Sequence, residues 1–230
     1  MKRLQRVPKA CVFDAYGTLF DVHSAAAAHR SLLGEKADAI SACWRLKQLQ
    51  YTWLRSLMGH YVDFWQITRD GLDFALEQEQ VDGDGIADTL MSAYLSLACF
   101  SEVPAALRAL NTAGQQCAIL SNGSPTMLAA AVQNSGIDNQ LQAVLSVDGI
   151  GIYKPDPRVY ALACQALHLQ PAEILFMSSN TWDVCGAASF GFQAVHVNRF
   201  GQPPERLPGS PVTQLMTLEG LPALLRSAAD

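Results

Sequence analysis

The chain has 230 residues, half of which are hydrophobic, and a formal net charge of −5 at pH 7. This composition is ample for a buried core and argues against disorder. Lysine and arginine are few and scattered, which excludes an extended basic surface of the kind that binds nucleic acids.

The first predicted element is a strand. The run "ACVF" (10–13) is short and apolar, and Asp14 follows it directly. Similar runs come late in the chain: "CAIL" (117–120), "AVLS" (143–146), "EILFM" (173–177) and "AVHV" (194–197). None alternates between polar and apolar residues, which is typical of strands buried on both faces.

Between the first and second strands lies a predicted helical insertion. It contains the patterns "AISACWRLKQLQYTWLRSLMG" and "GIADTLMSAYLSL" and no clear strand run. The sequence therefore predicts a core domain formed by residues 1–23 and 101–230, and an all-α cap formed by residues 24–100.

Helical segments alternate with the later strands. "SPTMLAAAVQNSG" offers Ser124 as an N-cap and Pro125 in the first turn, and "DPRVYALACQALHL" repeats this arrangement with Asp156 and Pro157. "NTWDVCGAASFGF" begins at Asn180, another favourable cap. This alternation predicts an α/β fold: a doubly wound, Rossmann-like parallel sheet with right-handed crossovers.

Polar side chains follow four of the predicted strands. Each of them alone has an ordinary explanation as a turn, a helix cap or a surface charge. Together they predict a site, because ligands of open α/β sheets bind beyond the carboxyl ends of the strands. The residues are Asp14 and Thr18, then Ser121 and Asn122, then Lys154, and finally Ser178, Ser179, Asn180 and Asp183.

Four segments resemble, in order, the motifs of the haloacid dehalogenase superfamily: "DAYGTL", "LSNGSP", "YKPDPRVY" and "SSNTWDVCGAASFG". Tyr16 in the first segment, "SSNTWD" in the last and Arg45 in the cap resemble more narrowly the L-2-haloacid dehalogenase branch. The cap stretches "WRLKQLQYTWLRSLMG" and "YVDFWQIT" are also similar to that branch, so the resemblance covers nearly the whole chain.

Tyr16 stands where the phosphatases of this superfamily carry a second aspartate, their general acid for the leaving oxygen. A halide leaves as a stable anion and needs no proton, so one aspartate suffices. The resemblance implies hydrolytic dehalogenation of short-chain L-2-haloalkanoic acids to D-2-hydroxy acids, with inversion, through an ester on Asp14.

The resemblance also implies roles for individual residues. The catalytic positions are Asp14 as nucleophile, Asp183 as base, Asn180 beside the hydrolytic water, Lys154 as the positive charge next to Asp14, Thr18 and Ser178 as orienting groups, Ser121, Arg45 and Tyr160. The substrate pocket comprises Tyr16, Arg45, Leu49, Phe64, Ser121, Asn122, Lys154 and Trp182, of which Arg45, Asn122 and Trp182 hold the halide.

No metal and no cofactor is expected, although Asp183 occupies a position that binds magnesium in the phosphatases. Two alternatives stay open. One is a magnesium-dependent phosphohydrolase of the same superfamily, and the other is a non-catalytic protein that binds small carboxylates. The intact set of Asp14, Lys154 and Asp183 argues against the second, because a binding protein has no need of a nucleophile and a base together.

The cysteines form no CxxC pair and the histidines form no metal-ligand cluster. We expect reduced thiols and a cytoplasmic protein, because no signal peptide or membrane-length apolar run is evident. The expected partners are a 2-haloacid substrate and a halide ion, with no nucleic acid and no membrane, and the resemblance implies a homodimer.

Overall fold

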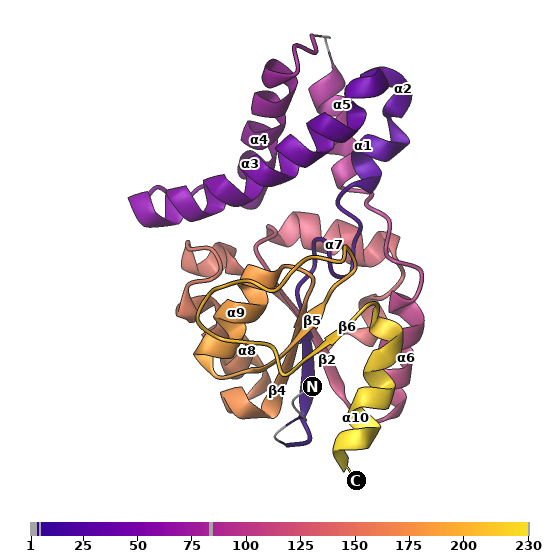
Figure 1. The fold of residues 1–230 in the computed structure, drawn as a ribbon, viewed down its shortest axis with the longest axis vertical. Coiled ribbons are helices and arrows are strands. Elements are labelled where there is room, and N and C mark those ends of the chain that lie inside the picture. The colour runs from indigo at the N-terminus through magenta and orange to yellow at the C-terminus, as the bar shows by residue number, and fades with distance from the viewer. Residues whose placement is uncertain (1–3, 5, 83–84, 230) are drawn as a thin grey trace.

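The computed structural model describes residues 4, 6–82 and 85–229. The outer ends of the predicted core domain, residues 1–3, 5 and 230, lie outside the described residues. In Figure 1 a group of helices stands at one end of the molecule, above a sheet that is covered by helices on both sides.

The sheet is parallel throughout, with the strand order β3-β2-β1-β4-β5-β6. The chain therefore winds outward from the central β1 in both directions, as the predicted doubly wound fold requires, and β1 and β4 lie side by side at the switch point. The strands are β1 (Ala10–Phe13), β2 (Gln116–Ser121), β3 (Ala143–Ser146), β4 (Ile174–Ser178), β5 (Gln193–Val197) and β6 (Thr213–Leu215).

The strand predictions are confirmed to within one residue at either end, with two corrections. β6 was not predicted, because it has only three residues and follows the proline- and glycine-rich segment of residues 201–211. The expectation that every run is buried on both faces is wrong for β3, which is an edge strand and leaves Val144 40% exposed. An edge position leaves one side of a strand without a neighbour.

The core helices begin where the sequence places their caps. The Ser124 hydroxyl accepts a hydrogen bond from the Met127 amide, and the Asp156 carboxylate accepts one from the Arg158 amide. In Figure 1, α8 and α9 cover one face of the sheet and α6 and α10 cover the other. The helices of the core are α6 (Val103–Thr112), α7 (Pro125–Asn134), α8 (Pro157–Leu167), α9 (Thr181–Phe190) and α10 (Leu221–Ala229).

The insertion between β1 and β2 is helical, as predicted. α3 and α4 pack along each other, and a Cβ atom on Gly71 of α4 would lie 3.1 Å from the backbone nitrogen of Gln48. The helices are α1 (Ser24–Ala28), α2 (Arg30–Leu33), α3 (Ala37–Met58), α4 (Phe64–Gln78) and α5 (Ile86–Tyr94). Short 3-10 turns cover Gly34–Lys36, Asp138–Gln140, Val147–Ile150, Pro171–Glu173 and Leu218–Gly220.

Two segments join the inserted helices to the sheet, and Arg199 binds both. Its side chain donates to the Thr18 carbonyl at 2.9 Å, lies over the Phe100 ring at 3.8 Å and pairs with the Glu102 carboxylate. The side chains of Arg199 and Glu102 are only 7% and 8% exposed. This nearly buried ion pair therefore fixes the connection that follows β1 to the one that precedes α6.

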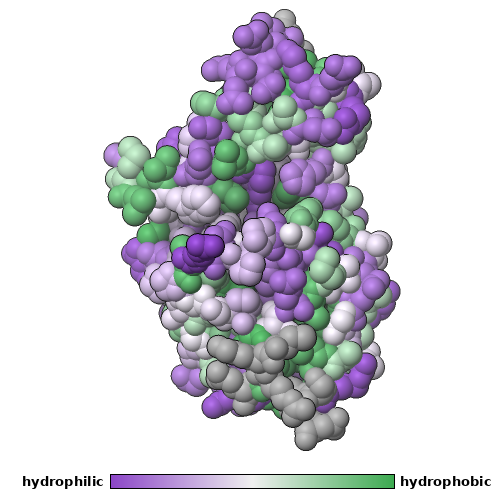
Figure 2. All heavy atoms as spheres, in the orientation of Figure 1, coloured by the Kyte–Doolittle hydropathy of each residue, from purple (hydrophilic) through white to green (hydrophobic). Residues whose placement is uncertain are grey.

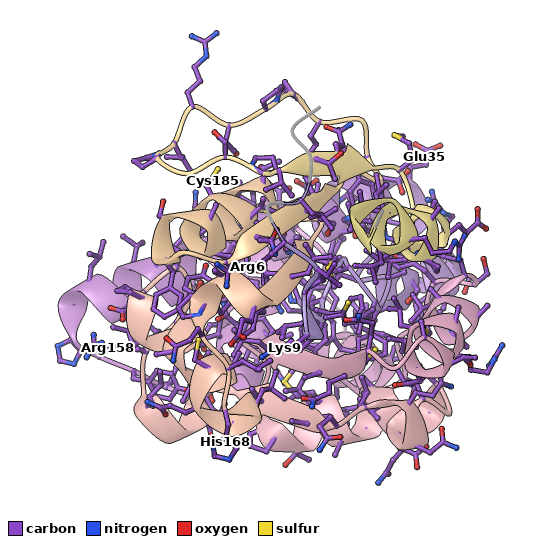
Figure 3. All side chains as sticks on the ribbon, turned by 90° about the horizontal axis from the view of Figure 1, so that it is seen from below. Arg6, Lys9, Glu35, Arg158, His168 and Cys185 are labelled. Atoms are coloured by element: carbon purple, nitrogen blue, oxygen red, sulfur yellow. The ribbon has the colours of Figure 1, made fainter. Side chains whose placement is uncertain are left out.

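The opposite end of the sheet lies away from the inserted helices. Figure 3 views the molecule from this end, where Arg6 and Lys9 precede β1 and Lys9 pairs with Glu173 at 2.7 Å. All six cysteines are free, as predicted, and Cys11, Cys117 and Cys185 are buried. Within the described ranges, no helix has both the length and the apolar character needed to cross a membrane.

Candidate active site

Asp14 is held by side chains from three segments at the carboxyl edge of the sheet. It follows β1 and is 6% exposed. Its Oδ2 atom accepts hydrogen bonds from Thr18 Oγ1 at 3.1 Å, Ser178 Oγ at 3.2 Å and Asn180 Nδ2 at 2.8 Å. Its Oδ1 atom accepts from Lys154 Nζ at 3.1 Å. The carboxylate is therefore fixed in one orientation, with Oδ2 more heavily occupied than Oδ1.

Lys154 lies between two carboxylates. Its ammonium is 1% exposed and lies 3.1 Å from Asp14 and 2.8 Å from Asp183, whose side chain is fully buried. The Tyr160 hydroxyl donates to Asp183 Oδ1 at 2.8 Å. Four side chains from different parts of the chain thus form one buried network with two negative charges and one positive charge.

The pKa values of this network follow from that imbalance. Burial alone lowers the pKa of Lys154, but the charges of Asp14 and Asp183 outweigh burial and raise it, so the ammonium stays protonated. Burial and the nearby Asp14 charge raise the pKa of Asp183 to about 6, against the opposing effects of Lys154 and Tyr160. A carboxylate with such a pKa can accept a proton near neutral pH.

Gly186 makes room for this network. A Cβ atom at position 186 would overlap the Tyr160 hydroxyl and would lie 2.8 Å from Cβ of Pro155. α9 can therefore approach α8 closely enough for Tyr160 to reach Asp183. This explains the small residue in the segment "WDVCGAASF".

Arg45 reaches this edge from α3. Its Nη2 donates to the Tyr16 carbonyl at 3.2 Å and to Asn180 Oδ1 at 3.3 Å, and its Nη1 donates to Gln48 Oε1 at 2.7 Å. Asn180 therefore contacts both Arg45 and Asp14. These contacts explain a difference from expectation. Asn180 precedes α9, but its side chain binds Arg45 and Asp14 and does not cap the helix.

A cavity of about 250 Å³ opens between the inserted helices and the core. Its walls include Arg45, Leu49, Asn180, Trp182 and Glu205. The cavity is therefore adjacent to Asn180, which binds Asp14, and to the guanidinium of Arg45. A larger groove, of about 750 Å³, runs along the exposed edge of β3 and is lined by none of these residues.

Tyr16 lies in an aromatic cluster beside Asp14. Its ring centroid is 5.6 Å from that of Phe64 and 5.6 Å from that of Tyr94. Its buried hydroxyl has no hydrogen-bond partner in the described part of the chain, and burial raises its pKa well above the usual value. Tyr16 is therefore a neutral group at the position that carries a second aspartate in the phosphatases of the superfamily.

The structure does not bring Asn122 to the cavity wall that contains Arg45 and Trp182. Asn122 Oδ1 instead accepts from the backbone nitrogen of Lys154 at 3.1 Å. Ser121 is fully buried at the end of β2, and its hydroxyl accepts from the Gly123 amide at 3.0 Å. These two residues shape the loop that follows β2 and hold it against the segment that carries Lys154.

The sequence interpretation missed Gln48, Thr68 and Tyr94, which lie behind Arg45. Gln48 Nε2 donates to Thr68 Oγ1 at 2.8 Å and to the Tyr94 hydroxyl at 3.1 Å. On a helix, Gln48 lies on the same face as Trp44, four residues earlier, and close to Arg45, three residues earlier. The sequence signal that could have identified Gln48 was therefore a polar residue on an otherwise apolar helix face.

In the described residues, no group of three or more His, Cys, Asp or Glu side chains is placed to hold a metal ion. The polar groups that gather around Asp14 are instead hydroxyls, an amide and one ammonium.

Comparison with known proteins gives a consistent answer. Residues 8–191 match the model of the haloacid dehalogenase-like hydrolases. The chain is 50% identical to (S)-2-haloacid dehalogenase 4A of Burkholderia cepacia over 86% of both proteins. It is similar to a crystal structure of a dehalogenase with an intermediate complex, at a TM-score of 0.94 and 45% identity, with 96% of this chain and 98% of that one covered.

It is also similar to the L-2-haloacid dehalogenase of Xanthobacter autotrophicus with chloropropionic acid covalently bound. That comparison has a TM-score of 0.89 and 38% identity, and it covers 95% of this chain and 98% of that one. The TM-scores of 0.94 and 0.89 show that these two proteins share the fold described above. The chain belongs to the haloacid dehalogenase-like hydrolases and, within them, to the family of the (S)-2-haloacid dehalogenases.

Proposed function

We propose that this protein hydrolyses short-chain L-2-haloalkanoic acids to D-2-hydroxy acids, with inversion at C2, through an ester on Asp14. The observation that carries the proposal is the buried Asp14–Lys154–Asp183 network, in which one carboxylate is fixed as a nucleophile and a second has a pKa of about 6. The relatives named (S)-2-haloacid dehalogenase support the same reaction.

In the first step, Asp14 attacks C2 from the side opposite the halogen. The bond between Asp14 Oδ1 and C2 forms while the carbon–halogen bond breaks and its electron pair leaves with the halide. Oδ1 is the better placed oxygen, because Oδ2 already accepts three hydrogen bonds. The ammonium of Lys154, 3.1 Å from Oδ1, offsets negative charge at the site, and no acid is needed for the leaving group.

In the second step, water attacks Cγ of Asp14 after giving a proton to Asp183. Negative charge then develops on Oδ2, where the hydroxyls of Thr18 and Ser178 and the amide of Asn180 donate. The bond from Cγ to Oδ1 breaks, and the alcohol oxygen takes the proton from Asp183. The remaining proton of the water is released when Asp14 returns to its ionised form.

We assign the substrate roles as the sequence resemblance implies them. Arg45, Asn122 and Trp182 bind the leaving halide, and Ser121 binds the substrate carboxylate beside Lys154. Tyr16, Leu49, Phe64 and Trp182 surround the alkyl group. Arg45, Leu49 and Trp182 share the wall of the 250 Å³ cavity, which supports their part of this assignment most directly.

We also propose the division into a core domain (residues 1–23 and 101–230) and a cap domain (residues 24–100). A cytoplasmic location fits the free cysteines. A homodimer fits the hydrophobic end of α3, where Leu54, Leu57 and Met58 are 50%, 85% and 67% exposed. Figure 2 shows this cluster in green at the projecting end of the helix.

The test is halide release from L- and D-2-chloropropionate, assayed separately in the presence of EDTA. We expect release from the L-form alone, and none from Asp14→Asn. A single turnover in heavy-oxygen water should place the label in the Asp14 carboxylate before it appears in product. Label found only in the hydroxy acid contradicts the ester mechanism, and magnesium-dependent turnover of p-nitrophenyl phosphate without halide release contradicts the proposed reaction.

A further inference from the structure

Gln48 is an amide on the buried face of a helix. It lies on α3 in line with Ile40, Trp44 and Thr52, and its residue is 1% exposed. Burying an amide costs free energy unless its hydrogen bonds are made. The role of this amide is therefore to be sought in the groups that it binds.

Both ends of the Gln48 amide are engaged. Oε1 faces Arg45, because a guanidinium can only donate, and the distance to Nη1 is 2.7 Å. Nε2 donates to Thr68 on α4 and to Tyr94 at the end of α5. Thr68 in turn donates to the Phe64 carbonyl at 2.6 Å. Three helices thus fix the orientation of one guanidinium through a single side chain.

The acceptors around Arg45 share a second property: none carries a charge. They are the amide oxygens of Gln48 and Asn180 and the carbonyl oxygen of Tyr16. Among the described residues, the ion pairs involve other arginines, and no carboxylate lies within 4 Å of Arg45. Lys154, in contrast, divides its charge between two carboxylates. The Arg45 charge is therefore the one left for an anion.

We propose that Gln48 is a positioning residue that orients Arg45 toward the leaving halide without neutralising it. The inference rests on the proposed function, in which Arg45 receives the halide. It explains why a neutral amide occupies a position where a carboxylate would hold an arginine more strongly. A glutamate at position 48 would form a buried ion pair with Arg45, and that pair would compete with the halide for the guanidinium.

The test compares three variants in the full-length protein. Gln48→Glu keeps the shape and adds a charge, Gln48→Met keeps the approximate volume and removes the acceptor, and Gln50→Glu adds the same charge to the same helix two residues away. The measurements are the inhibition constant for bromide, and the single-turnover rates of ester formation from L-2-bromopropionate and of ester hydrolysis. Circular dichroism monitors folding.

For Gln48→Glu we expect the bromide inhibition constant to rise roughly tenfold or more and ester formation to slow by a similar factor, which corresponds to about 1.4 kcal/mol or more. Gln48→Met should show a smaller loss in the same two quantities, because its guanidinium is mobile but still charged. Ester hydrolysis should stay within about twofold of the wild type in both, because Thr18, Ser178 and Asn180, which donate to Asp14 Oδ2, form no hydrogen bond with Gln48. Gln50→Glu should match the wild type.

The proposal is overturned if Gln48→Glu keeps the wild-type bromide inhibition constant, or if both Gln48 variants slow ester formation and ester hydrolysis equally, which indicates general disruption. If Gln48→Glu fails to fold, Gln48→Met decides, since unchanged ester formation in that variant also overturns the proposal. Failure of the proposed function is separate, because the wild-type protein would then release no halide and form no ester.

Discussion

The hydroxyl of Tyr160 offers a direct test of the proposal that Asp183 is the base. The hydroxyl donates to the fully buried carboxylate at 2.8 Å, and burial keeps the pKa of Tyr160 well above its usual value, so the donor stays protonated. Tyr160→Phe removes this bond and the longer one, of 3.3 Å, that the same hydroxyl donates to the backbone carbonyl of Asp183. The ionised form of Asp183 then loses stabilisation, and its pKa must rise.

The size of the shift follows from the energy of such a bond. A hydrogen bond to a charged group contributes roughly 1.5–3 kcal/mol, and one pKa unit corresponds to about 1.4 kcal/mol, so the pKa should rise by about one to two units. Asp183 accepts a proton only when ionised, so ester hydrolysis is lost as the pH falls through its pKa. In the free protein this pKa is about 6, and in the ester it is lower because the Asp14 charge is gone.

The assay is the decay of the ester on Asp14 after a single turnover, followed by the mass of the quenched chain between pH 4 and pH 9. The acidic limb of the rate profile should move upward by about one to two units in Tyr160→Phe, with rates near those of the wild type at high pH. Tyr153→Phe is the matched control, because it removes an equally buried hydroxyl that donates to the Val62 carbonyl at 2.7 Å and not to Asp183. A limb that stays in place in Tyr160→Phe would falsify the assignment of Asp183 as the base oriented by Tyr160.

Gly186→Ala should move the same acidic limb upward, because the added methyl group overlaps the Tyr160 hydroxyl and pushes it away from Asp183; a variant whose limb equals that of the wild type contradicts this reasoning. Arg199→Met should lower the free energy of unfolding in urea by about 3 kcal/mol, because it leaves Glu102 nearly buried and unpaired. The pair of the exposed Arg158 with Asp156 is its control, and Arg158→Met should lower the free energy of unfolding far less. Equal losses in the two variants would show that burial of the pair does not matter.

Much of the fold was predictable because its strands and helix starts depend on short stretches of sequence. Short apolar runs gave the strands around Asp14, and caps such as Ser124 and Asp156 gave the helix starts, since each depends on residues close together in the chain. β6 was missed because three residues carry too little pattern, and the exposure of β3 was missed because an edge position depends on the order of the strands.

The candidate site divides in the same way. Asp14, Lys154 and Asp183 could be grouped from the sequence, because each of them comes after the end of a predicted strand. Parallel strands that begin on the same side of a sheet have their carboxyl ends at one edge. Their distances, and the contact of Tyr160 with Asp183, needed the structure. The contact of Gln48 with Arg45 joins neighbours on one helix, but its importance depends on partners from α4 and α5, which no local pattern reveals.

Arg45 lies on α3 and Asp14 lies at the edge of the sheet, so the site has two parts that can be changed independently by substitution. One continuous helix carries the guanidinium and Leu49, whereas the proposed nucleophile Asp14 and the proposed base Asp183 lie beyond the ends of strands that are far apart in the sequence. We therefore expect substitutions along α3 to change which halide or chain length is accepted while Asp14, Lys154 and Asp183 keep their places. A library of variants confined to α3, and assayed with several haloacids, is therefore the smallest one expected to change the substrate range.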